Sequence, residues 1–528
     1  MPIVPVNDVG AVGVIKDQKP HTLPAAAWTQ AVNMRFDDNQ AYKIRGEDAV
    51  FGTPETDPYF LLPWEKGSNY FWIYAGSDEV YYTDGTTHTN ITRYTSSQGD
   101  DDYVAGSRPL WTGGILHGVP ILNNDNGQDY PQQWSETDSR LKDLDNWPAD
   151  HYCKVMRPFK NFLVALDITD SSDNYPYVVK WSHPADPGTV PSSWDETDAS
   201  KLAGEYPIAQ SGGKLVDCFP LRGNNIIYKT DAIWGMSPTG GLDVFRFTPL
   251  IQTVGMLAAR CAVEFLNSHF VVGTDDIILF DGTSPESLVS KRLRRWFFDN
   301  LSEDAKAQTY VFSNYPNKEI WVCFREVGEP TGYPNKALIW NWGMNTWTIK
   351  DLPSIAFSAY GRVASGDDAF DDSSGSFDTD FGAFGSVDFS PILHGKVYDT
   401  AGFLRGETGY DSNGDDYESL LERTGLTLAG LSRDGTPTTD PTSRKLLRAI
   451  YPKIESGAGV EISIQAGAQE YVDGPITWAP PQTFDPASDV KVDFAVNGKY
   501  LAVRFFSSSP KPWALLGYSL DLEIISRL

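Results

Sequence analysis

The clearest pattern of apolar and polar positions lies in residues 336–353 (KALIWNWGMNTWTIKDLP). Residues 337–340 form a short apolar run, turn-forming residues around Gly343 follow, and a second apolar run begins at Trp347. This pattern predicts a β-hairpin with a tryptophan on each arm. An isolated hairpin is marginally stable in water, so Trp340 and Trp347 are expected to pack in the core of a larger all-β array.

The same strand-turn-strand design recurs along the chain. Three copies are residues 69–85 (NYFWIYAGSDEVYYTDG), 224–236 (NNIIYKTDAIWGM) and 269–282 (HFVVGTDDIILFDG). Four further units open with comparable apolar runs, at Gly114 (GILHGVPILNN), Asn161 (NFLVALDIT), Lys318 (KEIWVCF) and Pro391 (PILHGKVYD). The tetrapeptide Ile-Leu-His-Gly occurs twice, at 115–118 and 392–395.

The spacing of these units indicates the fold. Unit starts lie mostly about 45 to 50 residues apart, the length of a four-stranded propeller blade, once insertions near 184–213 and 366–389 are set aside. The sequence therefore predicts an all-β fold with a β-propeller of six to eight blades, seven fitting best. A β-meander or sandwich without radial symmetry is the alternative.

The chain divides into three parts. Residues 1–60 read as an N-terminal arm and first strands, 61–435 as the propeller, and 443–528 as a C-terminal antiparallel β-sandwich. In this last part, apolar and polar residues alternate with period two, which predicts strands with one apolar and one polar face. The dipeptide at 497–498, Asn-Gly, predicts a two-residue hairpin turn, because both residues tolerate positive φ.

One insertion differs in composition from the rest. Residues 365–389 (SGDDAFDDSSGSFDTDFGAFGSVDF) contain aspartate, serine, glycine and five phenylalanines with almost no aliphatic residue. Such a segment builds no core of its own. We expect an acidic excursion from a blade, ordered where a partner or a neighbouring subunit covers the phenylalanines.

Composition and charge narrow the classes of function. The 528 residues carry a net charge of −27, which argues against a surface that grips nucleic acid. No signal peptide or transmembrane run is present, so we expect a soluble protein made in a cytoplasm, without membrane insertion. The four widely spaced cysteines are expected to be reduced core residues: Cys153, Cys218, Cys261 and Cys323.

Candidate chemistry is sparse. There is no GxSxG nucleophile motif, and the seven histidines are isolated, so we predict no enzyme activity, no catalytic residue, no cofactor and no metal. One calcium-like spacing stays open: Asp411, Asn413, Asp415 and Glu422 match positions 1, 3, 5 and 12 of an EF-hand loop. Position 6 is Asp416 instead of glycine, and the alternative is a plain turn before a strand.

Taken in order, the segments PVNDVGAVGVIKD, AYKIRGEDAVFG, YPYVVKWSHPADPGTVPSSWD, IIYKTDAIWGM, HFVVGTDDIILFDGT, KEIWVCF and ALIWNWGMNTWTIKDLP are similar to tail nozzle, or tail tubular, proteins of short-tailed bacteriophages. The resemblance runs over most of the chain. Each segment alone is only a strand-turn-strand, so the ordered set carries the likeness.

The resemblance implies a non-enzymatic virion protein of the phage tail. Its propellers would pack side by side in a homo-oligomeric ring, usually a hexamer, below the portal and adaptor ring. The ring would retain packaged DNA, pass it on ejection without specific binding, and meet adaptor proteins and possible tail fibre or spike proteins. The alternatives are a receptor- or polysaccharide-binding tail protein and, behind it, a propeller glycoside hydrolase.

Overall fold

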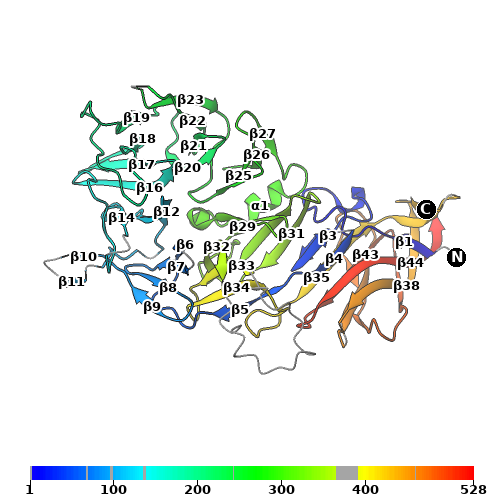
Figure 1. Ribbon diagram of the computed structural model, residues 1–528. Coiled ribbons are helices and arrows are strands. Elements are labelled where there is room, and N and C mark those ends of the chain that lie inside the picture. The colour runs from blue at the N-terminus through cyan, green and yellow to red at the C-terminus, as the bar shows by residue number, and fades with distance from the viewer. Residues whose placement is uncertain are drawn as a thin grey trace.

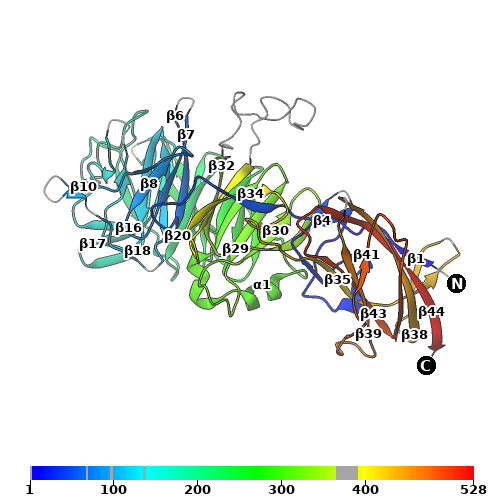
Figure 2. The ribbon, with the colours of Figure 1, turned by 90° about the horizontal axis from the view of Figure 1, so that it is seen from below.

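The computed structural model describes residues 3–37, 39–66, 69–95, 99–100, 102–106, 108–134, 138–241, 243–363, 390–433, 435–457 and 459–527. Figure 1 and Figure 2 show two bodies joined end to end, with both ends of the chain in the smaller one. The larger body is a β-propeller and the smaller one is a β-sandwich.

Seven four-stranded antiparallel units build the propeller. The first four are β6 (Phe60–Lys66), β7 (Asn69–Ala75), β8 (Val80–Thr83) and β9 (His88–Asn90); β12 (Trp111–Leu116), β13 (Val119–Asn124), β14 (Gln132–Gln133) and β15 (Lys142–Asp143); β16 (His151–Phe159), β17 (Phe162–Asp170), β18 (Asp173–Trp181) and β19 (Gly204–Pro207); and β20 (Leu215–Leu221), β21 (Asn224–Lys229), β22 (Ile233–Pro238) and β23 (Phe245–Ile251). The last three are β24 (Ala262–Phe265), β25 (Ser268–Val272), β26 (Ile277–Phe280) and β27 (Pro285–Ser287); β28 (Tyr310–Asn314), β29 (Glu319–Phe324), β30 (Lys336–Asn341) and β31 (Thr346–Asp351); and β32 (Ile355–Val363), β33 (Ser390–Lys396), β34 (Gly402–Thr408) and β5 (Gly46–Val50).

These units form a closed ring. The first strand of each unit contacts the first strands of its two neighbours, and β32 of the seventh unit contacts β6 of the first. The all-β propeller fold predicted from the sequence is therefore present, with seven blades. Each of the seven repeats found in the sequence lies in a different blade, and the segment 184–203 connects β18 to β19 within the third.

The predicted hairpin at 336–353 is formed by β30 and β31 of the sixth blade. Trp340 and Trp347 face each other across it, with ring centroids 6.1 Å apart. They are 5% and 0% exposed, so both belong to the core, as predicted. The four cysteines are free and buried, which also agrees with the prediction.

The seventh blade takes its outer strand from the start of the chain. Strand β5 pairs antiparallel with β34, Leu404 opposite Ala49, and so closes the ring with residues far apart in sequence. A Cβ atom on Gly46 would lie 1.6 Å from the main-chain oxygen of Asp411, so only glycine fits where β5 begins.

Two facing sheets build the sandwich. One contains β1 (Ile3–Val6), β3 (Met34–Asp37), β4 (Gln40–Lys43), β38 (Ser443–Ser456), β42 (Val492–Gly498) and β44 (Trp513–Arg527). The other contains β2 (Gln30–Val32), β35 (Ser419–Leu426), β39 (Ile462–Gln469), β40 (Thr477–Trp478), β41 (Gln482–Phe484) and β43 (Tyr500–Ser507). The predicted C-terminal sandwich is thus present, and N-terminal strands complete it.

The limits of the two bodies differ from the predicted ones. Strand β35 lies inside the predicted propeller range 61–435 but pairs with β2 and β43 of the sandwich. The predicted arm, 1–60, supplies strands to both bodies. Alternating apolar residues identify a strand from its sequence, but they do not identify its partner when that partner lies hundreds of residues away.

The predicted hairpin turn at Asn497–Gly498 is wrong. Strand β42 continues through Gly498, which pairs with Lys445, and the next strand, β43, belongs to the opposite sheet. Neither residue of the dipeptide has positive φ. A Cβ atom on Gly498 would lie 2.7 Å from that of Ala468, so the glycine permits a close approach between the sheets instead of a tight turn.

The remaining described elements are short. They are the 3₁₀ helices η1 (Pro20–Thr22) and η2 (Glu303–Gln308), the helix α1 (Arg294–Asn300), and the strand pairs β10 (Tyr94–Thr95) with β11 (Gly99–Asp100) and β36 (Leu428–Leu431) with β37 (Pro437–Thr439). Within the described ranges, no helix has the length and apolar character that crossing a membrane requires. The predicted acidic insertion, 365–389, lies outside the described residues.

Candidate functional site

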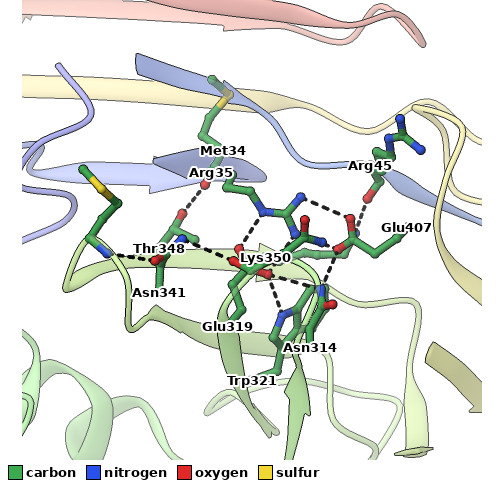
Figure 3. A network of polar contacts seen from close by, with 12 residues as sticks. Met34, Arg35, Arg45, Asn314, Glu319, Trp321, Asn341, Thr348, Lys350 and Glu407 are labelled. Carbon is green, nitrogen blue, oxygen red and sulfur yellow. Dashed lines mark hydrogen bonds and ion pairs between the residues drawn. The ribbon is translucent and has the colours of Figure 1, made fainter. Parts of the chain in front are cut away.

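The sandwich joins the propeller at its sixth and seventh blades, and three charged side chains meet there. Arg35 comes from β3 of the sandwich, Glu319 from β29 of the sixth blade and Glu407 from β34 of the seventh (Figure 3). The guanidinium of Arg35 donates from Nε and Nη2 to Glu319 at 2.5 and 2.8 Å, and from Nη1 and Nη2 to Glu407 at 3.1 and 2.7 Å. One arginine therefore binds two carboxylates, each with two hydrogen bonds. We call these three residues the junction cluster.

Local structure aims each carboxylate at the junction. Glu319 is the first residue of a strand that is otherwise apolar, EIWVCF, and all six of its positions are buried. Glu407 sits in the left-handed region, at φ 61°, where the register of β34 and β5 shifts. A bulge of this kind turns a side chain away from the regular alternation of the strand, so the strained backbone of Glu407 directs its carboxylate toward Arg35.

The junction cluster is almost completely excluded from water. The side chains of Arg35, Glu319 and Glu407 are 5%, 1% and 8% exposed. Burial opposes the charge of Arg35, but the two carboxylates outweigh it and raise the pKa of the guanidinium well above its usual value. Burial also raises the pKa of Glu319, against the attraction of Arg35. The neighbouring charge of Glu407 acts in the same direction on Glu319 and raises its pKa further.

Two neutral side chains of the sixth blade complete the hydrogen bonding. The indole of Trp321 donates to Glu319 Oε2 at 3.0 Å, and the amide of Asn314 donates to one oxygen of each carboxylate at 3.4 Å. These donors use lone pairs that Arg35 leaves free. These hydrogen bonds reduce the free-energy cost of burying the two carboxylates. A buried ion pair is stable only when such additional hydrogen bonds satisfy its remaining lone pairs.

A second ion pair connects the two blades beside the junction. Lys350 of β31 and Glu47 of β5 approach to 2.6 Å between Nζ and Oε1, with side chains 3% and 2% exposed. The same ammonium donates to the main-chain oxygen of Arg45 at 3.3 Å. The strand that closes the ring is therefore fixed to the sixth blade as well as to the seventh.

Further hydrogen bonds join the sandwich to the same strand of the sixth blade. The side-chain amide of Asn33 donates to Asp351 Oδ2 at 3.1 Å, and its oxygen accepts from the main-chain nitrogen of Asp351 at 2.8 Å. The hydroxyl of Thr348 donates to the main-chain oxygen of Met34. Polar contacts thus run along β31 from one end to the other.

The main chain also passes across the junction. Val32 of β2 pairs in parallel with Ile349 of β31, so the sheet of the sixth blade continues into one sheet of the sandwich and reaches ten strands. One apolar core also extends through both bodies and contains Tyr518 of the sandwich and Trp347 and Phe270 of the propeller. The arrangement acts as a clamp that makes the two bodies one unit.

The calcium-like set is not brought together. Gly414 donates its main-chain N–H to Asp411 Oδ1, and Asn413 Oδ1 accepts from the main chain of Ala49. Glu422 lies in β35 and forms an ion pair with Arg504. Among the described residues, no group of three or more His, Cys, Asp or Glu side chains could hold a metal ion. The geometry matches the plain turn that was left open as the alternative.

Two of the cavities on the propeller bear on function. One, of about 770 Å³, lies beside the outer strands β19 and β23 and is lined by Trp181, Tyr206, Phe247 and charged residues of the 196–203 loop. The other, of about 480 Å³, is lined by Lys291, Arg294 and other residues around α1. The basic run that leads into α1, KRLRRW, stands out in an acidic chain.

Sequence reasoning missed the junction cluster. Its three members stand alone in segments that read as ordinary strands, and no motif or spacing connects them. One signal was available: a charged residue at the start of an apolar strand, such as Glu319 in KEIWVCF, needs a partner of opposite charge if it is buried. The sequence does not show that the partner is Arg35.

The chain was compared with protein families, curated proteins and solved structures. No family model and no curated protein matches the sequence. Similar solved structures include the type-IX secretion-system surface component PorZ of Porphyromonas gingivalis (9% identity, TM-score 0.33) and Raptor of Chaetomium thermophilum (10%, 0.37). Another is the AfRom2 CNH domain (9%, 0.34).

The matches cover 73%, 69% and 69% of this chain, and 43%, 29% and 97% of PorZ, Raptor and the CNH domain. The chain therefore matches less than half of the first two proteins. Similarity at these identities and TM-scores assigns no activity to this chain.

Proposed function

We propose that this protein is a structural subunit of the tail of a short-tailed bacteriophage. In this proposal six copies form a ring that continues the DNA channel below the portal and adaptor ring. The ring retains packaged DNA and lets it pass during ejection. The protein acts without catalysis, resides in the virion, and contacts adaptor proteins and tail fibre or spike proteins.

The observation that carries this proposal is the clamped junction between the two bodies. A wall around pressurised DNA has to transmit load through each subunit without hinging. Here a continuous sheet, a shared apolar core and the junction cluster of Arg35, Glu319 and Glu407 connect propeller and sandwich. Densely packed interiors have low compressibility and transmit strain, so a subunit of this construction suits a load-bearing ring.

Charge supports the same role. The net charge of −27 per chain, multiplied by the copies of a ring, gives a field that repels the DNA backbone. A duplex passing such a wall is expected to slide and not to bind. The resemblance of the sequence, segment by segment in order, to tail nozzle proteins supports a DNA channel of a phage tail over other kinds of channel.

Assembly tests the proposal directly. The chain is purified alone and mixed with the adaptor ring of the same phage, and both samples are examined by negative-stain electron microscopy. We expect six-fold rings, formed alone or on the adaptor. A chain that remains monomeric with the adaptor, or mass spectra of purified virions that lack this polypeptide, would contradict it.

Polysaccharide binding is the second candidate, and the cavity beside β19 and β23 favours it. Tyr206 and Phe247 stack there with ring centroids 4.4 Å apart and planes parallel within 1°, and Trp181 lines the same cavity. Aromatic faces beside carboxylates, here Glu196 and Asp198, suit sugar rings. Binding of host surface polysaccharide that disappears in Y206A, without rings in the micrographs, would favour this candidate.

A further inference from the structure

The axis of the propeller is crossed by a belt of contacts to which every blade contributes one residue. In order along the chain these residues are Phe60, Gly113, Arg157, Asp217, Arg260, Tyr310 and Phe357. They come from the first strands of the blades, or in the case of Arg260 from the position two residues before β24. Because the first strands contact each other around the ring, the belt lies at the centre of the fold.

One half of the belt is aromatic. Phe357 stacks on Phe60, with centroids 5.4 Å apart, and packs against Tyr310 at 5.0 Å. The guanidinium of Arg260 lies over the ring of Phe357, with Cζ 4.8 Å from the centroid. This contact uses the face of the ring and engages none of the N–H donors of Arg260 in a hydrogen bond.

The other half of the belt is charged. Arg157 donates from Nε and Nη2 to Asp217 at 2.8 and 2.7 Å, and from Nη1 to the main-chain oxygen of Gly113 at 3.0 Å. Asp217 also accepts the main-chain N–H groups of Cys218 and Arg260. Both oxygens of Asp217 are therefore occupied, and its charge is committed to Arg157.

Arg260 is left without an acceptor among the described residues. It is 7% exposed, and its buried Nε and Nη1 atoms have no hydrogen-bond partner. Burial lowers the pKa of Arg260 to about 10, and repulsion by Arg157 adds to this effect. The carboxylate of Asp125 acts in the opposite direction, but among the described residues no hydrogen bond or ion pair joins it to Arg260, and Asp125 Oδ1 accepts from the main chain of Leu110.

A buried guanidinium with free donors beside a second arginine requires a negative partner, because an unpaired buried charge is strongly unfavourable. The planar fork of arginine matches carboxylate and phosphate oxygens. We propose that Arg260, held over Phe357 on the propeller axis, binds one small oxyanion, a carboxylate or a phosphate, per chain.

Titration with free anions tests this site on the full chain. The protein is placed in chloride buffer of fixed ionic strength and titrated with inorganic phosphate in one series and with acetate in another. Melting temperature and calorimetric binding are measured in each. We expect saturable binding of one ion and a rise in melting temperature in at least one series, and the series that responds identifies the class of ion.

Two variants and a control make the result specific. R260M is expected to lose the anion-dependent rise while melting no lower than wild type in chloride alone, because methionine fills the space without a charge. R260K keeps the charge but not the fork and is expected to bind the ion at least tenfold more weakly. R433M, at an exposed arginine, is expected to behave as wild type.

Three outcomes would overturn the proposal. The first is a wild-type melting temperature equal in phosphate, acetate and chloride. The second is an anion effect that persists in R260M. The third is an R260M protein that folds but melts several degrees lower than wild type in chloride, which would show that the arginine is already satisfied within the chain.

Discussion

Arg35 donates two hydrogen bonds to Glu319 although 284 positions separate the two residues in the chain. The first belongs to the sandwich and the second to the propeller, and both are nearly inaccessible to water. Because their pairing forms only when the two bodies meet, it couples the folding of one to the folding of the other.

Replacing Arg35 by methionine should destabilise the whole protein. The change leaves Glu319 and Glu407 buried without a cation, and removing one partner of a buried ion pair costs about 3–5 kcal/mol. We expect urea unfolding, followed by tryptophan fluorescence, to show this loss in the free energy of unfolding. The propeller and sandwich should also begin to unfold in separate steps.

The matched control is R444M. Arg444 pairs with Glu470 on the surface, where the side chains are 38% and 50% exposed. Exposed pairs contribute about 0–1 kcal/mol, so this variant should unfold like wild type. Equal effects of R35M and R444M would show that the junction cluster does not hold the two bodies together.

Closure of the ring depends on a glycine at the start of β5. In G46A the new Cβ would lie 1.6 Å from the main-chain oxygen of Asp411, so the strand has to move away from the seventh blade. Overpacking of this kind costs about 1–3 kcal/mol, and we expect a loss at the upper end of that range in thermal unfolding.

The same blade offers a control in Gly402 of β34. A Cβ atom there meets nothing within 4 Å, so G402A should change the free energy of unfolding by less than about 0.5 kcal/mol. Limited proteolysis should release the N-terminal segment faster from G46A than from G402A. Similar stability of the two proteins would mean that β5 is not under this steric constraint.

Stability should fall below neutral pH because of buried histidines. Burial lowers the pKa of His269 to about 4 and that of His394 to about 3. Tyr228 donates its hydroxyl proton to His269 Nδ1 and Nε2 donates to the main-chain oxygen of Pro220, which fixes the neutral ring. Below pH about 6.5 these histidines bind protons in the unfolded chain, while in the folded chain they stay neutral. The free energy of unfolding therefore decreases as pH falls.

Removing one of these histidines should flatten the pH dependence. Between pH 7 and 4.5, urea unfolding of H269Q should lose about 2 kcal/mol less than wild type, since one pKa unit corresponds to about 1.4 kcal/mol. The exposed residue His117 provides the control, and H117Q should keep the wild-type slope. A slope for H269Q equal to that of wild type would contradict the assignment.

The acidic insertion should be dispensable for folding. Val363 of β32 pairs with Ser390 of β33, so the ends that flank residues 364–389 are neighbours and a short Asn-Gly turn can join them. A chain with residues 365–389 replaced in this way should melt within a few degrees of wild type but assemble into rings at least tenfold more weakly.

A second variant separates length from composition. Serines replace the five phenylalanines of the insertion while its length and its aspartates are kept, and micrographs should show the same weakening of ring formation. If the deletion variant does not fold, the insertion belongs to the core and the interpretation of 365–389 as an excursion fails.

Sequence patterns were sufficient for local structure. The two tryptophans of the 336–353 hairpin, and each of the seven repeats, lie in the strands where alternation and turn residues placed them. Such patterns report which face of a strand is buried. They give the blade count only because the repeats follow the chain in order around the ring.

Long-range pairing was beyond these patterns. The Asn-Gly dipeptide at 497–498 has the composition of a tight turn, but packing between the sheets decides its conformation. The site depends on the same kind of contact, since Arg35 and Glu407 reach Glu319 from distant segments. A single sequence contains the charge of each residue and not the distance between them.

Strand β1 pairs with β44, and β5 completes a blade whose other strands span residues 355–408. A ribosome therefore releases the first strands long before their partners exist. Several hundred residues have to be synthesised while these edges stay unpaired, which exposes the nascent chain to aggregation and favours protection by chaperones. The propeller cannot close before β34 has been made, and the sandwich cannot close before β44 has been made.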